Sequence, residues 1–309
     1  AVEKAREFKA DMVIAVGGGS VVDSSKTIAI TAPSRHQAWD FYSRKAKPQK
    51  ALPILAVLTL AATGTEMNPL AVLQNHQSGQ KTSFAHPLMY PAHSFLDPQN
   101  TITVNREYTA YGIADLTAHA LEAWFGNGDA SLSDRIVISI IKEAMDFGPE
   151  LLNDLNNYEL RAKIMYAATL ALNGLTQNGR ISGDWGVHAI GHEMSLLFDI
   201  PHGASLTVAY PAWLKFHKKS AEQRIILLGR KLFGVHTADE TIEHLEYFFE
   251  TLGVPTRLKD INLNKKDKQQ TLIASMNKNK AQGMHHSLSD DDRATIVALM
   301  DAEKPKSTY

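Results

Sequence analysis

The chain has 309 residues, 44% of them hydrophobic and 21% charged, a globular composition with enough length for two domains. The net charge of −1 gives no electrostatic reason to expect nucleic acid or a membrane surface as a partner. Because the sequence contains no Cys, disulfides and thiolate metal sites are excluded, and His and carboxylates remain as metal ligands. No apolar run reaches the roughly 18 residues that a membrane helix needs, so we predict a cytoplasmic protein.

The first third of the chain alternates helix and strand patterns. Residues 1–10 have the pattern of a helix already under way, so we expect a fragment whose true N-terminus lies upstream. Short apolar runs predict strands at 12–16, 54–60 and 94–96, and a helix is predicted over 20–30. Continuous apolar strands that alternate with helices indicate a parallel sheet.

From Arg106 onward, helical periodicity dominates. We therefore predict an α/β nucleotide-binding domain with a parallel sheet over 1–105, lacking its N-terminal part, and an all-α metal-binding domain over 106–309. The lysine-rich stretch at 259–268 is predicted to be a solvated loop. The helices predicted in the second domain cover 106–125, 131–147, 158–175, 184–197, 221–232, 240–252 and 290–302.

A glycine-rich loop, Gly17–Ser20, stands between the first strand and the helix that follows it. This arrangement presents backbone N–H groups to a phosphate at a helix N-terminus, although a tight turn without a ligand would have the same pattern. Ser20 with Asp23 predicts a capping box. The common dinucleotide fingerprint, Gly-x-Gly-x-x-Gly, is excluded because Val22 stands where its third glycine belongs. A P-loop of the nucleoside triphosphatase type is not expected, because no glycine directly precedes Lys26.

A second small, polar loop runs from Thr59 to Glu66, after the second strand. In open α/β sheets, ligands bind outside the carboxyl ends of the strands, so the two loops support each other as a ligand site. An ordinary threonine-rich turn is the alternative for this segment.

One carboxylate and three imidazoles could form a metal site. Asp115 and His119 lie four residues apart in a predicted helix, which places them on one face. His188 and His192 share a face of a later helix, and His202 follows in a Pro-His-Gly that we interpret as the end of that helix. Such ligands suit a divalent ion, Fe²⁺ or Zn²⁺.

The metalloprotease motif is excluded, because Leu196 stands where His192-Glu193 would require a histidine. The other histidines show no such spacing and are predicted to be surface or structural residues, among them His36, His76, His86, His217, His236, His244, His285 and His286.

These motifs resemble the iron-containing (type III) alcohol dehydrogenase family over essentially the whole chain. The segment Ala171–Gly174 with Asp184-Trp185 is similar to the butanol dehydrogenase and NADPH-dependent aldehyde reductase branch. The matching motifs are Gly-Gly-Gly-Ser-x-x-Asp-x-x-Lys at 17–26, Thr-Gly-Thr-Glu at 63–66, Leu-Asp-Pro at 96–98, Asp115-x-x-x-His119-Ala120-x-Glu122, His188-x-x-x-His192 and Pro201-His202-Gly203.

The resemblance implies a role for each matching residue. It implies His192 as a histidine beside the metal that assists proton transfer, and Lys81 as a lysine near the nicotinamide ribose. It implies metal ligation by Asp115, His119, His188 and His202, and cofactor binding by Gly18, Gly19, Ser20, Asp23, Thr59 and Thr63.

The implied activity is hydride transfer between NADPH or NADH and a short-chain aldehyde or alcohol such as butanal or butanol, in a homodimer. Family members carry about half of the nucleotide domain ahead of the first residue here, including the loop that selects NAD or NADP. Two alternatives stay open: a zinc-dependent polyol (glycerol-type) dehydrogenase, whose site uses fewer ligands, and a non-catalytic metal- or nucleotide-binding remnant.

Overall fold

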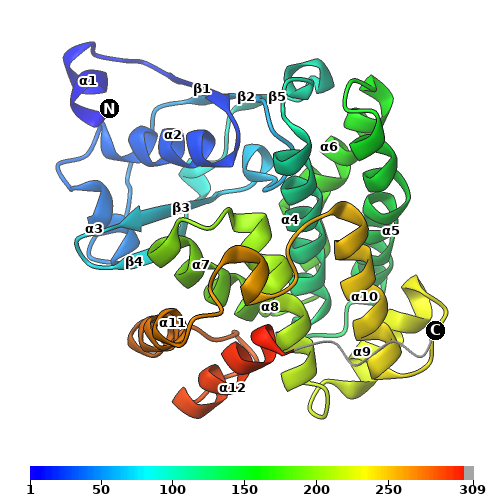
Figure 1. Cartoon of the computed structure of the whole chain (residues 1–309). Coiled ribbons are helices and arrows are strands. Elements are labelled where there is room, and N and C mark those ends of the chain that lie inside the picture. Colours follow the sequence, from blue (N-terminus) through cyan, green and yellow to red (C-terminus); the bar gives the residue numbers. More distant parts are fainter. Residues whose placement is uncertain (303–309) are drawn as a thin grey trace.

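The structure is a computed structural model that describes residues 1–302. Three parallel strands form its sheet, β1 (Val13–Gly17), β2 (Ile54–Leu58) and β5 (His93–Phe95), in the order β1-β2-β5. Helix α2 (Gly19–Thr31) follows β1 and packs against it (Figure 1). These elements confirm the predicted parallel sheet, with strand ends shifted by at most two residues.

The other face of β1 is open. Ala15 is buried beneath α2, whereas Ile14 and Val16 are 58% and 60% exposed. In strands, neighbouring side chains point to opposite faces, so the two exposed side chains share one face. Apolar side chains gathered on an exposed face are typical of a surface that packs against further polypeptide.

A two-stranded antiparallel sheet, β3 (Leu70–Asn75) and β4 (Gln80–Ala85), was not predicted from the sequence. Its second strand is largely polar, which conceals the usual alternation. The hairpin packs on α2 and on α3 (Ala38–Tyr42), where Phe84 of β4 contacts Phe41.

Helices make up the second part of the chain, around a large core that includes the fully buried Trp124, Tyr210 and Trp213. The α-helices outside the sheet region are α4 (Arg106–Trp124), α5 (Ser131–Asn153), α6 (Tyr158–Leu172), α7 (Gly186–Phe198), α8 (His202–Phe216), α9 (Glu222–Leu232), α10 (Ala238–Leu252), α11 (Lys266–Asn279) and α12 (Asp290–Asp301). The remaining helices are α1 (Val2–Glu7) and the short η1 (Thr65–Met67), η2 (Pro87–Met89), η3 (Pro98–Thr101), η4 (Leu175–Gln177) and η5 (Leu258–Ile261).

Three local predictions were wrong. Pro201 is the N-cap of α8 and does not simply end α7, so His202 begins a new helix. The lysine-rich loop ends at Lys265, and its last residues enter α11. The capping box at Ser20 does not form, because Gly18 is the N-cap of α2 and no side chain caps this helix.

Helix α4 begins at Arg106, and the domain boundary after residue 105 remains our proposal.

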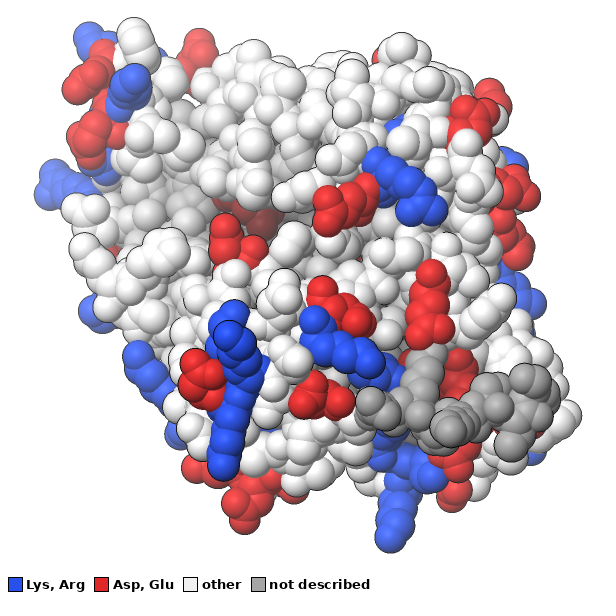
Figure 2. All heavy atoms as spheres, viewed as in Figure 1, with Lys and Arg blue, Asp and Glu red and all other residues white. Residues whose placement is uncertain are grey.

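Charged side chains of both signs are interspersed over the face shown in Figure 2. The visible face therefore carries no extended field of one sign, in keeping with the net charge of −1. Within residues 1–302, the structure has no helix that is both long and apolar enough to cross a membrane.

Candidate metal centre and cofactor loops

Helix α4 carries three buried polar side chains, Asp115, His119 and Glu122, on one face. Their spacing of four and three residues brings them into register along the helix. The side chain of Asn105 starts α4 by accepting a hydrogen bond from the backbone N–H of Tyr108, at 2.8 Å. The helix therefore holds a carboxylate and an imidazole in the protein interior at fixed relative positions.

Helices α7 and α8 bring two further histidines to this face of α4. His188 lies in the first turn of α7, and His202 is the first residue of α8. A Cβ atom at Gly203 would lie 2.3 Å from the carbonyl oxygen of Tyr111, so only glycine lets α8 approach α4 this closely.

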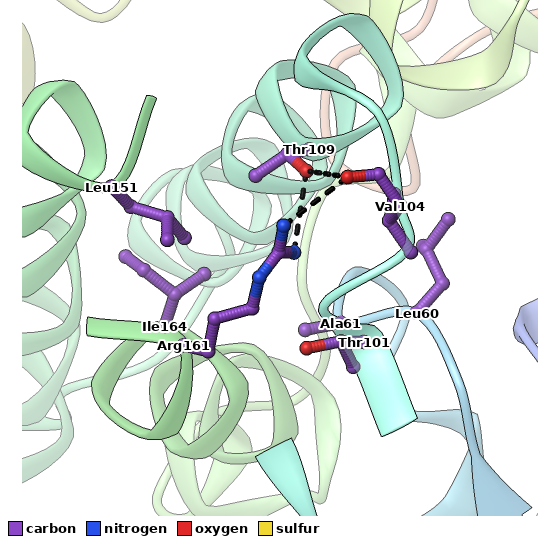
Figure 3. Close-up of a pocket in the computed structure, with 8 residues that line it drawn as sticks. All are labelled: Leu60, Ala61, Thr101, Val104, Thr109, Leu151, Arg161 and Ile164. Carbon is purple, nitrogen blue, oxygen red and sulfur yellow. Dashed lines mark hydrogen bonds between the residues drawn. The ribbon is translucent and has the colours of Figure 1, made fainter. Parts of the chain in front are cut away.

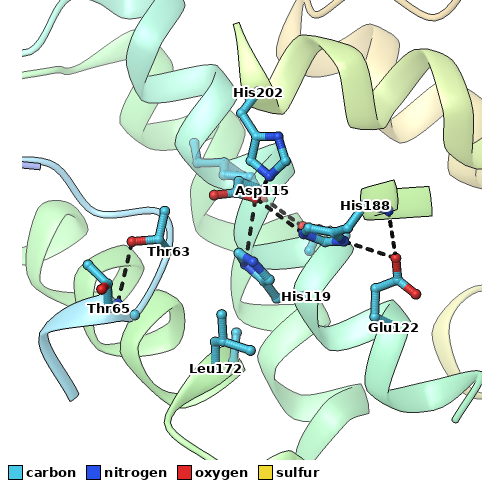
Figure 4. A network of polar contacts seen from close by, with 12 residues as sticks. Thr63, Thr65, Asp115, His119, Glu122, Leu172, His188 and His202 are labelled. Carbon is cyan, nitrogen blue, oxygen red and sulfur yellow. Dashed lines mark hydrogen bonds and ion pairs between the residues drawn. The ribbon is translucent and has the colours of Figure 1, made fainter. Parts of the chain in front are cut away.

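The three imidazoles surround one oxygen of Asp115 (Figure 4). The Oδ1 atom of Asp115 lies 3.6 Å from Nδ1 of His119, 3.9 Å from Nε2 of His188 and 3.7 Å from Nε2 of His202. These distances exceed those of good hydrogen bonds. Asp115 Oδ1, His119 Nδ1 and His188 Nε2 are buried and have no hydrogen-bond partner.

A divalent metal ion would satisfy these orphaned atoms. In a tetrahedral site with bonds of about 2.1 Å, neighbouring donor atoms lie roughly 3.4 Å apart. Donor atoms of Asp115, His119 and His188 all lie within 4.8 Å of one another, and His202 reaches the same oxygen. A set of one oxygen and three nitrogen donors fits Fe²⁺ or Zn²⁺.

The pKa values of the site residues also favour a bound cation. Burial lowers the pKa of His119 to about 4 and that of His188 to about 3, and it lowers that of His202 well below its usual range. All three imidazoles are therefore neutral at pH 7, as metal ligation requires. Burial also raises the pKa of Asp115, so an ionised Asp115 calls for a cation beside it.

Glu122 fixes the orientation of His188. Its Oε1 atom accepts a hydrogen bond from the backbone N–H of His188 at 3.0 Å and lies 2.9 Å from Nδ1 of the same residue, which must donate when Glu122 is ionised. Its Oε2 atom accepts from the backbone N–H of Trp185 at 2.5 Å. A proton held on Nδ1 leaves Nε2 free to bind a metal. The sequence motif contained Glu122, but no role was predicted for it.

His192 lies one turn beyond His188, and its ring centroid is 5.4 Å from that of His202. It is not a member of the three-residue group of close donors. Burial lowers its pKa well below the usual range, so this imidazole is neutral beside the cluster.

The two predicted loops meet beside α2. A Cβ atom at Gly19 would lie 2.8 and 2.9 Å from the Cγ2 and Oγ1 atoms of Thr63, so the loops face each other without room for a side chain. The backbone N–H of Thr59 donates to the carbonyl oxygen of Gly17 at 3.1 Å. The helix N-terminus at Gly18, Gly19 and Ser20 has no side-chain cap, which suits an anion.

Asp23 and Lys26 of α2 form hydrogen bonds with the end of the second loop and with the start of β3. Asp23 accepts hydrogen bonds from the Thr65 hydroxyl at 2.5 Å and from the backbone N–H of Val72 at 2.9 Å. The fully buried Lys26 ammonium donates to the Thr65 hydroxyl at 2.8 Å and to the carbonyl oxygen of Leu70 at 2.6 Å. The carboxylate of Asp23 is thus engaged within the protein, and direct contact with a cofactor stays a prediction.

Lys81 lies on β4, the second strand of the hairpin. Burial lowers its pKa, and the negative charges that oppose this shift are those of Asp115 of the cluster, Asp23 of α2 and Asp199. A cation in this position can contact a ligand that extends from the glycine loop to the cluster.

A small cavity near the start of α4 lies between Leu60 and Ala61 of the second loop and Arg161 of α6 (Figure 3). Arg161 lines it and donates hydrogen bonds to Val104, Thr109 and Leu155. Its volume of about 10 Å³ corresponds to a single water molecule. This arginine therefore joins α6 to the start of α4, and the cavity is too small for a substrate.

Comparison with known proteins identifies relatives over the whole chain. Residues 1–98 match a family model described as iron-containing alcohol dehydrogenase, and residues 109–303 match the C-terminal model of that family. A probable NADH-dependent butanol dehydrogenase 1 of Bacillus subtilis is 38% identical over 302 residues, 94% of this chain and 77% of the relative. An NADPH-dependent aldehyde reductase of Escherichia coli is 34% identical over 85% of this chain and 70% of the relative.

Solved structures show the same fold. The crystal structure of NADH-dependent butanol dehydrogenase A from Thermotoga maritima superimposes with a TM-score of 0.92 at 33% identity. The match covers 97% of this chain and 79% of that one.

Proposed function

Since the chain belongs to the iron-containing alcohol dehydrogenase family, we propose that it transfers hydride between a nicotinamide dinucleotide and a short-chain aldehyde such as butanal. Family membership makes it an oxidoreductase of the alcohol dehydrogenase and aldehyde reductase type. The observation that carries the proposal is the buried Oδ1 atom of Asp115, which three neutral imidazoles surround without a hydrogen bond.

We propose Asp115, His119, His188 and His202 as the ligands of one divalent ion, Fe²⁺ in preference to Zn²⁺. The donor set suits both ions, and the family favours iron. A bound ion at this place would polarise the substrate carbonyl as a Lewis acid. Asp115 supplies the negative charge that attracts the cation, and Glu122 holds His188 in the tautomer that leaves Nε2 free.

The glycine loop is the proposed site of the cofactor pyrophosphate. The uncapped N-terminus of α2 offers the backbone N–H groups of Gly18, Gly19 and Ser20. Thr59 and Thr63 of the second loop border the same space, and Lys81 lies toward the metal cluster, where the nicotinamide ribose would lie. The nicotinamide supplies the hydride, so the protein has to bind and orient it.

His192 is the proposed proton donor. Its neutral ring can donate the proton of one ring nitrogen to the substrate oxygen while the other ring nitrogen takes a proton from solvent, so the ring need not hold a net positive charge. Its place beside His202, outside the proposed ligand set, keeps its ring nitrogens available for this transfer.

A substrate panel tests this function. Oxidation of NADH and of NADPH is followed with butanal, and reduction of NAD and NADP with butanol and with glycerol. We expect turnover with the butanal and butanol pair and none with glycerol. Turnover with glycerol alone would favour the polyol dehydrogenase alternative, and binding of neither dinucleotide, followed by NADPH fluorescence, would indicate a non-catalytic remnant.

We also propose a homodimer, as the family resemblance implies, and a cytoplasmic location, as the sequence analysis predicts. Light scattering coupled to gel filtration measures the mass directly, against the 34.1 kDa of one chain. A mass of one chain would contradict the dimer.

A further inference from the structure

Asn279, the last residue of α11, joins two segments that are far apart in the sequence. Its Nδ2 atom donates to the carbonyl oxygen of Gly79, in the turn of the β3–β4 hairpin, at 3.1 Å. The same amide donates to both carboxylate oxygens of Glu193 on α7, at 3.1 and 3.0 Å. Figure 1 shows α11 beside α12, below α7 and the hairpin.

Glu193 is a fixed anchor for this amide. The residue is 4% exposed, and burial raises its pKa. Ser275, one turn earlier on α11, donates to its Oε2 atom at 2.6 Å. A buried carboxylate has to be hydrogen-bonded to be tolerated, so the two α11 donors hold α7 and α11 together. The proposed catalytic chemistry makes no use of Glu193, although it adjoins His192.

The hairpin depends on side-chain contacts for its position. It forms a sheet of its own and has no strand pairing with β1, β2 or β5. A lone two-stranded hairpin is marginally stable in water. At its open end, the backbone of β3 forms hydrogen bonds with the side chains of Lys26 and Asp23 on α2. At its turn, Gly79 accepts from Asn279, and the carbonyl oxygen of Ser78 accepts from Nζ of Lys278 at 3.3 Å, so both residues are linked to the end of α11.

We propose that Asn279 and Glu193 are positioning residues that fix the hairpin on α7 and so place Lys81 beside the cofactor. Lys81 follows Gly79 by two residues on β4, and α7 carries His188 and His192. The amide therefore links the hairpin that carries Lys81 to the helix that carries the histidines, beside the direct packing of β4 on α7. The functional part of this inference rests on the proposed dehydrogenase activity.

Hydrogen exchange of the full chain tests the mechanical part without any cofactor. In Asn279→Ala, amides of β3 and β4 should exchange about tenfold faster than in the wild type, because the turn loses its link to Glu193 and α7 and keeps only the hydrogen bond from Lys278. Ser275→Ala is the matched control: it removes a hydrogen bond to the same carboxylate but leaves the link to Gly79 intact, so hairpin exchange should stay unchanged. Asn279→Asp, which has the same size but no donor, gives a second variant if Asn279→Ala fails to fold.

Steady-state kinetics test the functional part. Asn279→Ala should raise KM for the nicotinamide cofactor about fivefold to tenfold, with kcat and metal content within twofold of the wild type, and Ser275→Ala should leave KM unchanged. Unchanged hairpin exchange in both Asn279 variants would overturn the inference, whatever the activity. A wild type without turnover would overturn the proposed function and leave the exchange result to decide the positioning role.

Discussion

Replacing Glu122 with Gln should weaken the metal site while leaving its proposed ligands in place. The carboxylate accepts three hydrogen bonds, two from His188 and one from Trp185. An amide of the same shape offers one acceptor oxygen and one donor group. If its oxygen faces His188, its NH₂ group opposes the N–H of Trp185. If it is reversed, it donates to Nδ1 of His188 and moves the ring proton to Nε2, the nitrogen that would bind the metal.

The expected loss in metal affinity is 10- to 100-fold, the usual effect of removing a carboxylate behind a metal-binding histidine. This range corresponds to about 1.4 to 2.8 kcal/mol. In the metal-free protein burial raises the pKa of Glu122 to about 8, so at pH 7 this group is largely protonated and an amide resembles it. The stability of the metal-free protein should therefore not fall by a comparable amount, since the carboxylate form is the one that a bound cation favours.

Competition with a chromogenic chelator measures the affinity, and urea unfolding of the metal-free protein measures the stability. Glu107→Gln, the same change in the exposed first turn of α4, is the matched control: it should leave metal affinity unchanged and lower the free energy of unfolding by at most about 1 kcal/mol, through Tyr111 and the helix N-terminus. A Glu122→Gln protein that binds Fe²⁺ or Zn²⁺ within twofold of the wild type would refute the argument that this carboxylate sets the tautomer of His188.

Four further substitutions separate the parts of the site. His202→Ala should lose both metal and turnover, whereas His192→Ala should keep metal, measured by elemental analysis, and lose rate; unchanged activity in His202→Ala would contradict the ligand assignment. Gly19→Val would force side-chain atoms onto Thr63 and should weaken dinucleotide binding at least tenfold in a fluorescence titration, with metal content unchanged. Lys26→Met should lower the free energy of unfolding by about 3 kcal/mol at pH 7, because its buried acceptors lose their donor. Burial lowers the pKa of Lys26 to about 8 from 10.5, so the unfolded chain binds the proton more tightly and wild-type stability should gain a contribution between pH 8 and 10.5. Urea unfolding across that range should show the gain in the wild type and not in Lys26→Met.

Periodicity in the sequence predicted most of the elements, because long helices and buried strands carry their own patterns. It failed at Pro201, where a proline two residues before a glycine suggests the end of a helix but is equally compatible with the start of the next. It also failed at the β3–β4 hairpin, whose second strand is polar and lies partly buried against α2 and α3.

The spacing of Asp115 and His119 predicted one face of one helix, and the structure places both there. No local pattern could place His188 and His202 around the same oxygen, since that depends on how α7 and α8 pack against α4. Glu122 could have been found from its position seven residues after Asp115, which puts it on the same face of α4.

The most direct test of the proposed metal-dependent activity is a metal titration of the metal-stripped protein under anaerobic conditions, with butanal-dependent oxidation of NADH and NADPH as the readout. We expect no turnover without metal, and turnover that rises with added Fe²⁺ to a plateau at one ion per chain. Full activity of the stripped protein, or one bound ion per chain with no activity toward butanal, would contradict the proposed function.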